Sequence, residues 1–148
     1  MAAGSCQRFF ARAGVLNFTC ELGGAGQVNP AIVSLASHGI QNMLKAFGVL
    51  SGEIQTPLMQ GREPSIMARV PDSGCYIMAE DSGLYEPLVD LGDPVEANQI
   101  IGRLHYPDNL AKPPLEVTAS RSGFLLCKRA PGRTTRGDNI AIIAQEVS

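Results

Sequence analysis

The chain has 148 residues, 45% of them hydrophobic and 18% charged, which is enough for one globular domain or two small units with a packed core. The formal net charge is −2, so nothing suggests the basic surface of a nucleic-acid-binding protein. No run approaches the ~18 apolar residues of a membrane-spanning helix, and the four cysteines are dispersed, as in a protein of the reducing cytoplasm. We therefore expect neither nucleic acid nor membrane among the partners, and a homo-oligomer is left open.

The first predicted elements are a short helix and a strand. The helix covers about 7–13 and ends before Gly14, because glycine is common directly after a helix. The run 15–20 is short, apolar and rich in strand formers, which predicts a buried strand. No second strand is predicted before residue 50. Since an unpaired strand cannot satisfy its backbone groups, we expect preceding sequence to supply its neighbours.

An acid and three glycines follow this predicted strand. Glu21 stands at its end, and Gly23, Gly24 and Gly26 come directly after. A carboxylate at the end of a buried strand is partly desolvated, which raises its pKa and suits it to proton transfer. Glycines permit positive φ angles or the close approach of a ligand. The alternative interpretation is a polar strand end followed by a flexible turn.

A long helix is predicted next, over 30–47. Asn29 is a favourable N-cap, Pro30 suits the first helical position, and Gly48 marks the end. Apolar residues recur between them at helical spacing and form one stripe. His38 lies within this helix without ligand partners at metal-site spacing, so we interpret it as a structural or surface residue.

The sequence after residue 50 changes character, and we place a domain boundary between residues 60 and 61. Glycine and proline are frequent beyond it, and short strands alternate with turn signals every eight to twelve residues, which predicts a small β sandwich or barrel. The predicted strands are 66–70, 75–79, 83–88, 100–105, 115–119, 123–128 and 140–145.

The β region also contains an internal repeat. A shift of 40 residues places Ser-Gly-Leu at 82–84 on Ser-Gly-Phe at 122–124, Gly92 on Gly132, and Ile100 on Ile140. We therefore predict two similar halves. In the polar turn before Ile100, we expect Asn98 to take a left-handed conformation, which asparagine tolerates.

Evidence for a catalytic centre built by this chain alone is weak. His105 and Asp108 form the sole His-x-x-acid pair, without a third ligand nearby in the sequence, so a strand-end histidine beside a turn aspartate is the simpler interpretation. The sequence contains no Gly-x-Ser-x-Gly and no Walker loop.

One family nevertheless accounts for nearly the whole chain, from about residue 14 onward. The sequence Thr-Cys-Glu-Leu-Gly-Gly-x-Gly at 19–26, followed by a helix and by Gly-Leu-Tyr-Glu-Pro at 83–87, resembles the C-terminal half of the succinylglutamate desuccinylase/aspartoacylase family. The resemblance implies a zinc-dependent deacylase of N-acyl amino acids, with a carboxypeptidase-like catalytic domain before a small β domain. It also implies that Glu21 is the general base, that Gly23, Gly24 and Gly26 keep the edge of the site open, and that Gly23 and Gly24 lie at the substrate.

The family's zinc ligands, a His-x-x-Glu pair and a later histidine, lie upstream of this glutamate, and no histidine precedes Glu21 here. We therefore expect the chain to be the C-terminal part of such an enzyme. Zinc would be the cofactor of the intact protein, with none held by this chain alone, and an upstream zinc-binding half would be required as partner.

The predicted fold class is α+β. Residues 1–60 would be a remnant strand and helix of a carboxypeptidase-like α/β domain, and residues 61–148 would form an all-β domain. The repeat in that domain resembles the barrel-sandwich hybrid of biotinyl and lipoyl domains. The alternative function is therefore a stand-alone carrier or interaction module, with Lys112 as the modified lysine. Two prolines follow Lys112 and give a stiff extended chain instead of a hairpin tip, which favours an arm or lid over 107–114.

Overall fold

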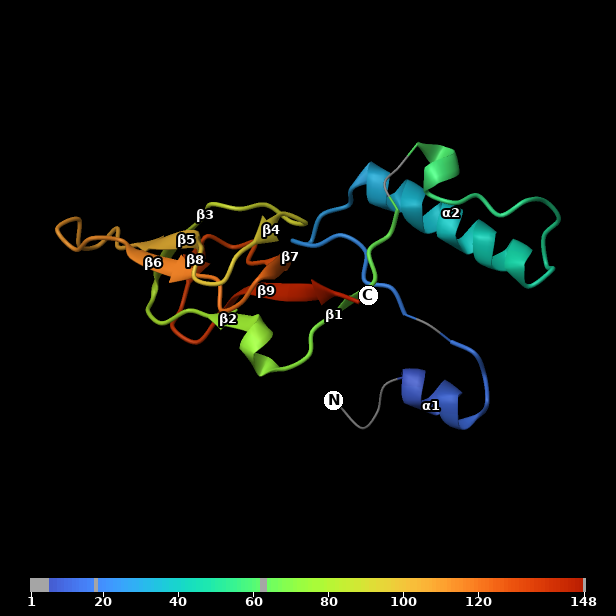
Figure 1. Ribbon diagram of the computed structural model, residues 1–148, viewed down its shortest axis with the longest axis horizontal. Helices are drawn as coiled ribbons and strands as arrows, with labels where there is room; N and C mark the ends of the chain where they lie inside the picture. Colours follow the sequence, from blue (N-terminus) through green and yellow to red (C-terminus); the bar gives the residue numbers. More distant parts are fainter. Residues whose placement is uncertain (1–5, 18, 62–63, 148) are drawn as a thin grey trace. The chain divides into compact units, whose positions relative to one another are not determined.

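The structure is a computed structural model that describes residues 6–17, 19–61 and 64–147, with no account of the side chains of residues 6 and 7. The chain divides into two compact units, residues 1–56 and 57–148 (Figure 1). The division falls four residues before the boundary predicted from the sequence. None of the described helices is long and apolar enough to cross a membrane.

The first unit contains two helices, α1 (Cys6–Arg12) and α2 (Pro30–Ala46). The N-terminus of α2 forms as predicted, because the Asn29 side chain accepts a hydrogen bond from the Ala31 N–H and Pro30 occupies the first turn. The helix ends one residue before the predicted end, and Gly48 follows with a φ of 69°. The segment after the helix is held back on it by the side chain of Asn42, which bonds the backbone N–H and C=O of Gln55.

The predicted strand over 15–20 is wrong. Residues 15–17 and 19–20 lie in no strand, and Phe18 lies outside the described residues. The side chains expected in a core are open instead, since Val15 is 50% and Leu16 is 75% exposed. The physical reason is the lack of a partner: a strand is stable only when a neighbour satisfies its backbone groups, and the first unit has no described strand.

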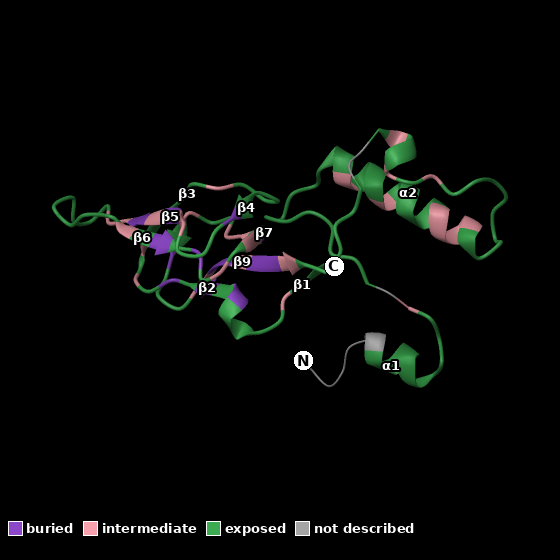
Figure 2. Cartoon of the chain, in the orientation of Figure 1, coloured by how far each residue is buried: buried purple, intermediate pink, exposed green. Residues whose placement is uncertain are grey.

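The first unit has almost no interior. None of its described residues is buried, and the apolar residues of α2 are exposed or half-buried (Figure 2). Helices in proteins are stabilised mostly by the packing of an apolar face. The apolar face of this 17-residue helix has no residue that is buried by packing.

The second unit is built from short strands and two 3₁₀ turns. The predicted strands correspond to seven of the observed ones, and two further strands of two residues each, β4 and β8, were not predicted. The strands are β1 (Ala68–Arg69), β2 (Tyr76–Met78), β3 (Gly83–Pro87), β4 (Pro94–Val95), β5 (Ile100–His105), β6 (Leu115–Thr118), β7 (Gly123–Lys128), β8 (Arg133–Thr134) and β9 (Asn139–Glu146), and the turns are η1 (Leu58–Gln60) and η2 (Ser73–Cys75).

These strands form two antiparallel sheets. One sheet has the order β1-β9-β7-β4, with β2 also paired to β9, and the other has the order β6-β5-β3-β8. Side chains from both sheets make one core that includes Ile101, Leu104, Leu125, Ile140 and Ile143. All buried residues of the described chain belong to this unit (Figure 2).

The two sheets are related by an internal twofold repeat. Strands β2, β3, β4 and β5 correspond in order to β6, β7, β8 and β9. When each strand is exchanged for its counterpart, the order β2-β9-β7-β4 of one sheet becomes the order β6-β5-β3-β8 of the other. The edge strands β2 and β6 also share an irregularity in their pairing. The β2–β9 pairing shifts its register between Ile77 and Met78, and the β6–β5 pairing shifts between Val117 and Thr118, which are the equivalent residues. We call residues 72–105 the first half and residues 112–146 the second half; each sheet takes strands from both.

The repeat distance changes along the halves. It is 40 residues up to β3 and β7, as predicted, but 39 residues afterwards, because β4 and β8 begin at Pro94 and Arg133. The residue equivalent to Ile140 is therefore Ile101 instead of Ile100, and both are almost fully buried. The sequence comparison at a constant shift of 40 was wrong by one residue in this part.

The polar turns before β5 and β9 show the correspondence at atomic detail. Asn98 and Gly137 both have left-handed φ angles, 67° and 89°, as expected for Asn98 from the sequence. Their backbone N–H groups donate to the carbonyl oxygens of Ala119 and Ala79, both at 2.8 Å. Each half therefore fixes its own turn by bonding to the other half.

Candidate functional site

Glu21 lies on the irregular segment between α1 and α2 and is exposed. The burial from which its role in proton transfer was argued is absent, because the strand before it does not form in the described residues. What remains is its place in the sequence, directly before the glycine-rich turn that leads into α2. Its role as a base is therefore a proposal that the local structure leaves untested.

The glycines after Glu21 make a tight turn. Gly23 and Gly26 have φ angles of 80° and 68°, and Ala25 between them has 58°. The turn is closed by the Gln27 N–H, which donates to the Gly24 oxygen at 3.2 Å. Three left-handed residues within four positions, two of them glycines, account for glycine in this segment without reference to a ligand.

The described residues do not fit a zinc site. They contain no group of three His, Cys, Asp or Glu side chains that could hold a metal ion. His38 is exposed on α2. His105 lies at the end of β5 and Asp108 in the turn after it, as the simpler interpretation has it, and Nε2 of His105 is 2.8 Å from Oε2 of Glu86 on β3.

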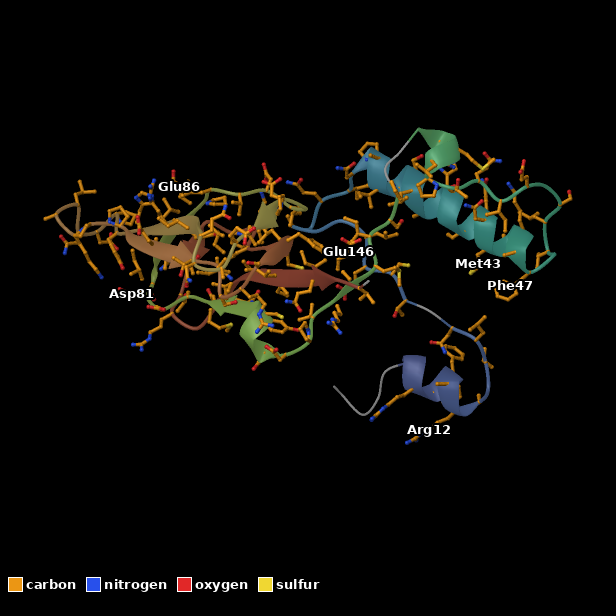
Figure 3. All side chains as sticks on the ribbon, in the orientation of Figure 1. Arg12, Met43, Phe47, Asp81, Glu86 and Glu146 are labelled. Carbon is orange, nitrogen blue, oxygen red and sulfur yellow. The ribbon has the colours of Figure 1, made fainter. Side chains whose placement is uncertain are left out.

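A cluster of polar side chains holds the segment between the two halves. Oδ2 of Asp81 accepts hydrogen bonds from Nζ of Lys112 at 2.7 Å and from the Tyr106 hydroxyl at 3.1 Å. The ammonium of Lys112 also lies 3.5 Å from the centre of the Tyr106 ring. The Lys112 ammonium, with the Ser82 N–H and Tyr106, lowers the pKa of Asp81 to about 2, and Asp81 raises the pKa of Lys112. Asp81 and Glu86 are labelled in Figure 3.

An open hollow adjoins this cluster, at the side of β3 and β8. Residues of the 106–112 segment form one wall and the start of β3 forms another. The lining residues are Ser82, Gly83, Leu84, Tyr106, Pro107, Asp108, Asn109, Lys112, Arg133, Thr134 and Thr135. Lys112, the lysine of the carrier alternative, therefore lines this hollow and is ion-paired with Asp81.

A second ion pair also joins the two halves. The guanidinium of Arg121 bonds both carboxylate oxygens of Asp72, at 2.8 and 3.1 Å. Asp72 also accepts from the Gly74 N–H at 2.7 Å and so caps η2. Arg121, followed by the Gly74 N–H, lowers the pKa of Asp72. Neither ion pair was predicted from the sequence.

Comparison with known proteins gives relatives over nearly the whole chain. The chain is 38% identical over 136 residues to an N-alpha-acetyl-L-2,4-diaminobutyric acid deacetylase of Halomonas elongata, which covers 92% of the chain and 39% of that protein. Its structure matches a succinylglutamate desuccinylase/aspartoacylase from Rhodobacter sphaeroides with a TM-score of 0.85 and 33% identity, over 93% of the chain and 42% of that protein.

A product-bound ectoine utilization protein EutE from Ruegeria pomeroyi also matches, with a TM-score of 0.86 and 30% identity, over 97% of the chain and 42% of that protein. The chain therefore spans about two fifths of the length of the relatives that it matches. No protein-family model matches the chain.

The fold, mostly strands with few helices, is that of the C-terminal part of these relatives. The chain belongs to the succinylglutamate desuccinylase/aspartoacylase family, as the counterpart of the C-terminal part of its members. The family predicted from the sequence is thereby confirmed.

Proposed function

We propose that the chain is the C-terminal portion of a zinc-dependent amidohydrolase that removes an acyl group from an N-acyl amino acid. The observation that carries the proposal is the 38% identity over 136 residues to the Halomonas elongata deacetylase, which is 92% of this chain. Its substrate is an N-acetylated diamino acid, and we propose the same general class for this chain. The protein would act in the cytoplasm.

The chain would be inactive without a zinc-binding half. Its described residues offer no set of metal ligands, so the zinc of the family would have to be held by the part of the relatives that this chain does not cover. The apolar residues of α2 support the same proposal, since they are exposed or half-buried and none is buried within the first unit.

Glu21 would act as the general base. Its carboxylate would accept a proton from the attacking water, whose oxygen bonds the amide carbon, and would return that proton to the amine as the carbon–nitrogen bond breaks. Its exposure in the described chain fits a surface that another domain completes. Gly23 and Gly24 would keep the substrate side of the site free of side chains.

The β unit would cap the site and restrict which substrate enters. Its twofold arrangement of two interlocked halves, with the turns at Asn98 and Gly137 fixed across the halves, supports the proposal that it is a barrel-sandwich hybrid like biotinyl and lipoyl domains. A carrier function gains no support from this likeness, because the Lys112 ammonium is bound to Asp81.

A chimera tests the proposal. The upstream part of the Halomonas elongata deacetylase is joined to residues 14–148 of this chain, and hydrolysis is measured on a panel of N-acyl amino acids. We expect turnover of at least one member of the panel, and none by the upstream part alone. A chimera that binds stoichiometric zinc and folds, yet hydrolyses no member of the panel, would contradict the proposal.

A further inference from the structure

The ion pairs Asp72–Arg121 and Asp81–Lys112 occupy equivalent places in the internal repeat. A shift of 40 residues carries position 72 onto position 112 and position 81 onto position 121. Each pair joins the segment before the first strand of one half to the turn after the first strand of the other half. The charges are inverted between the two places, so the first half supplies both acids and the second half supplies both bases.

The geometry at the two places is alike. The closest contacts between charged atoms are 2.8 Å for Arg121 with Asp72 and 2.7 Å for Lys112 with Asp81. Each acid also accepts a hydrogen bond from a nearby backbone N–H, of Gly74 or of Ser82, which fixes the direction of its carboxylate. The pairs therefore act as matched contacts across the pseudo-twofold axis.

Four pairs of equivalent buried positions in the two halves hold aliphatic residues of similar volume. These positions are Ile77 and Val117, Ala79 and Ala119, Ile101 and Ile140, and Leu104 and Ile143. Two further pairs differ, since Tyr85 corresponds to Leu125 and Val95 to Thr134. Apolar cores accept similar shapes with modest cost, so the four matched pairs distinguish weakly between a first half packed on a second half and two copies of one half.

We infer that the two charge-inverted ion pairs make each half select the other half and reject its own copy from another molecule. If two first halves paired with the same geometry, Asp72 of each would face Asp81 of the other. If two second halves paired, Lys112 would face Arg121. Like charges at these contacts are repulsive, whereas all four charges are matched in the native pairing. Complementary charges select between similar pairings in the same way in coiled coils.

Refolding of variant chains tests this inference. Two full-length versions with tags of different mass are mixed unfolded, refolded by dilution from urea, and analysed for mixed oligomers by native mass spectrometry. The decisive variant is Asp81→Lys with Lys112→Asp. It keeps both native pairs attractive but makes the contacts between identical halves attractive as well. We expect it to form several-fold more mixed oligomer than the unsubstituted chain.

A fourfold variant is the matched control. Adding Asp72→Lys and Arg121→Asp to the first two substitutions gives a basic first half and an acidic second half, so identical halves repel again. It loses the backbone bonds at both acids, whereas the twofold variant loses those at one. If the local bonds were the cause, the fourfold variant would form the most mixed oligomer; the inference predicts that it returns to the level of the unsubstituted chain.

The outcome is decided by comparison of these chains. Equal amounts of mixed oligomer in the unsubstituted chain and the twofold variant, or more in the fourfold variant than in the twofold one, would overturn the inference. If the first twofold variant does not refold, Asp72→Lys with Arg121→Asp makes the same change of charge pattern at the other place and is read in the same way.

Discussion

The buried side chain of Leu104 gives a direct test of where the stability of this protein resides. Leu104 lies on β5 opposite Tyr85 of β3 and Leu115 of β6, and none of its surface is exposed. Leu104→Ala removes three buried carbon atoms, worth about 2.4 kcal/mol at ~0.8 kcal/mol each. The cavity left behind raises the expected loss to about 3–5 kcal/mol. That is a large share of the ~5–15 kcal/mol that holds a typical domain folded.

The matched control is Leu110→Ala. Leu110 is 90% exposed in the segment between the two halves, so the same chemical change is expected to alter the free energy of unfolding by less than about 0.5 kcal/mol. Urea unfolding of the full chain, followed by circular dichroism in the far ultraviolet, measures both variants. The reasoning is refuted if Leu104→Ala and Leu110→Ala unfold at the same urea concentration with the same slope.

Three further results are expected. A carbon-13 NMR titration should give the Asp81 carboxylate a pKa of about 2, below its usual 3.8; its contribution to stability is then complete above pH ~4 and is lost as the pH falls through about 2, and Lys112→Met should move the midpoint upward. Asn98→Val should lower the free energy of unfolding by about 1–2 kcal/mol because of the left-handed backbone, whereas Asn98→Gly should be nearly neutral in urea unfolding. Elemental analysis of the chain alone after mild chelation should find well under one zinc per chain, and stoichiometric zinc would contradict the absence of a ligand set in its described residues.

The elements that could be predicted from the sequence are those with local causes. The helix α2 begins with a capping asparagine and a proline, and both act within one turn. Seven strands of the β unit alternate with turn residues, and the repeat indicated two similar halves. The two-residue strands β4 and β8 were not predicted, because they are too short for a sequence pattern and are defined by their pairing to β7 and β3.

The errors and omissions come from contacts that are distant in sequence. The predicted strand over 15–20 had the right composition, but its formation depends on a partner strand, and the described residues of the first unit form none. The ion pairs join residues 31 and 49 positions apart, beyond any local pattern. The repeat contained a signal for these pairs, because Asp72 and Asp81 correspond to Lys112 and Arg121, which have the opposite charge. The sequence does not show that a twofold axis relates the two halves, and without that axis the charges cannot be assigned to pairs.

Glu21→Gln in the active chimera tests most directly the proposal that this chain supplies the general base of an amide hydrolase. Glutamine keeps the shape of the side chain but cannot accept the proton. General-base catalysis typically contributes ~10²–10⁴-fold, so kcat/KM should fall by about that factor with zinc content unchanged. Glu53→Gln is the control, because Glu53 is a second exposed acid of the first unit, and it should keep the rate of the unsubstituted chimera. Equal rates in the Glu21→Gln and Glu53→Gln chimeras would contradict the proposal.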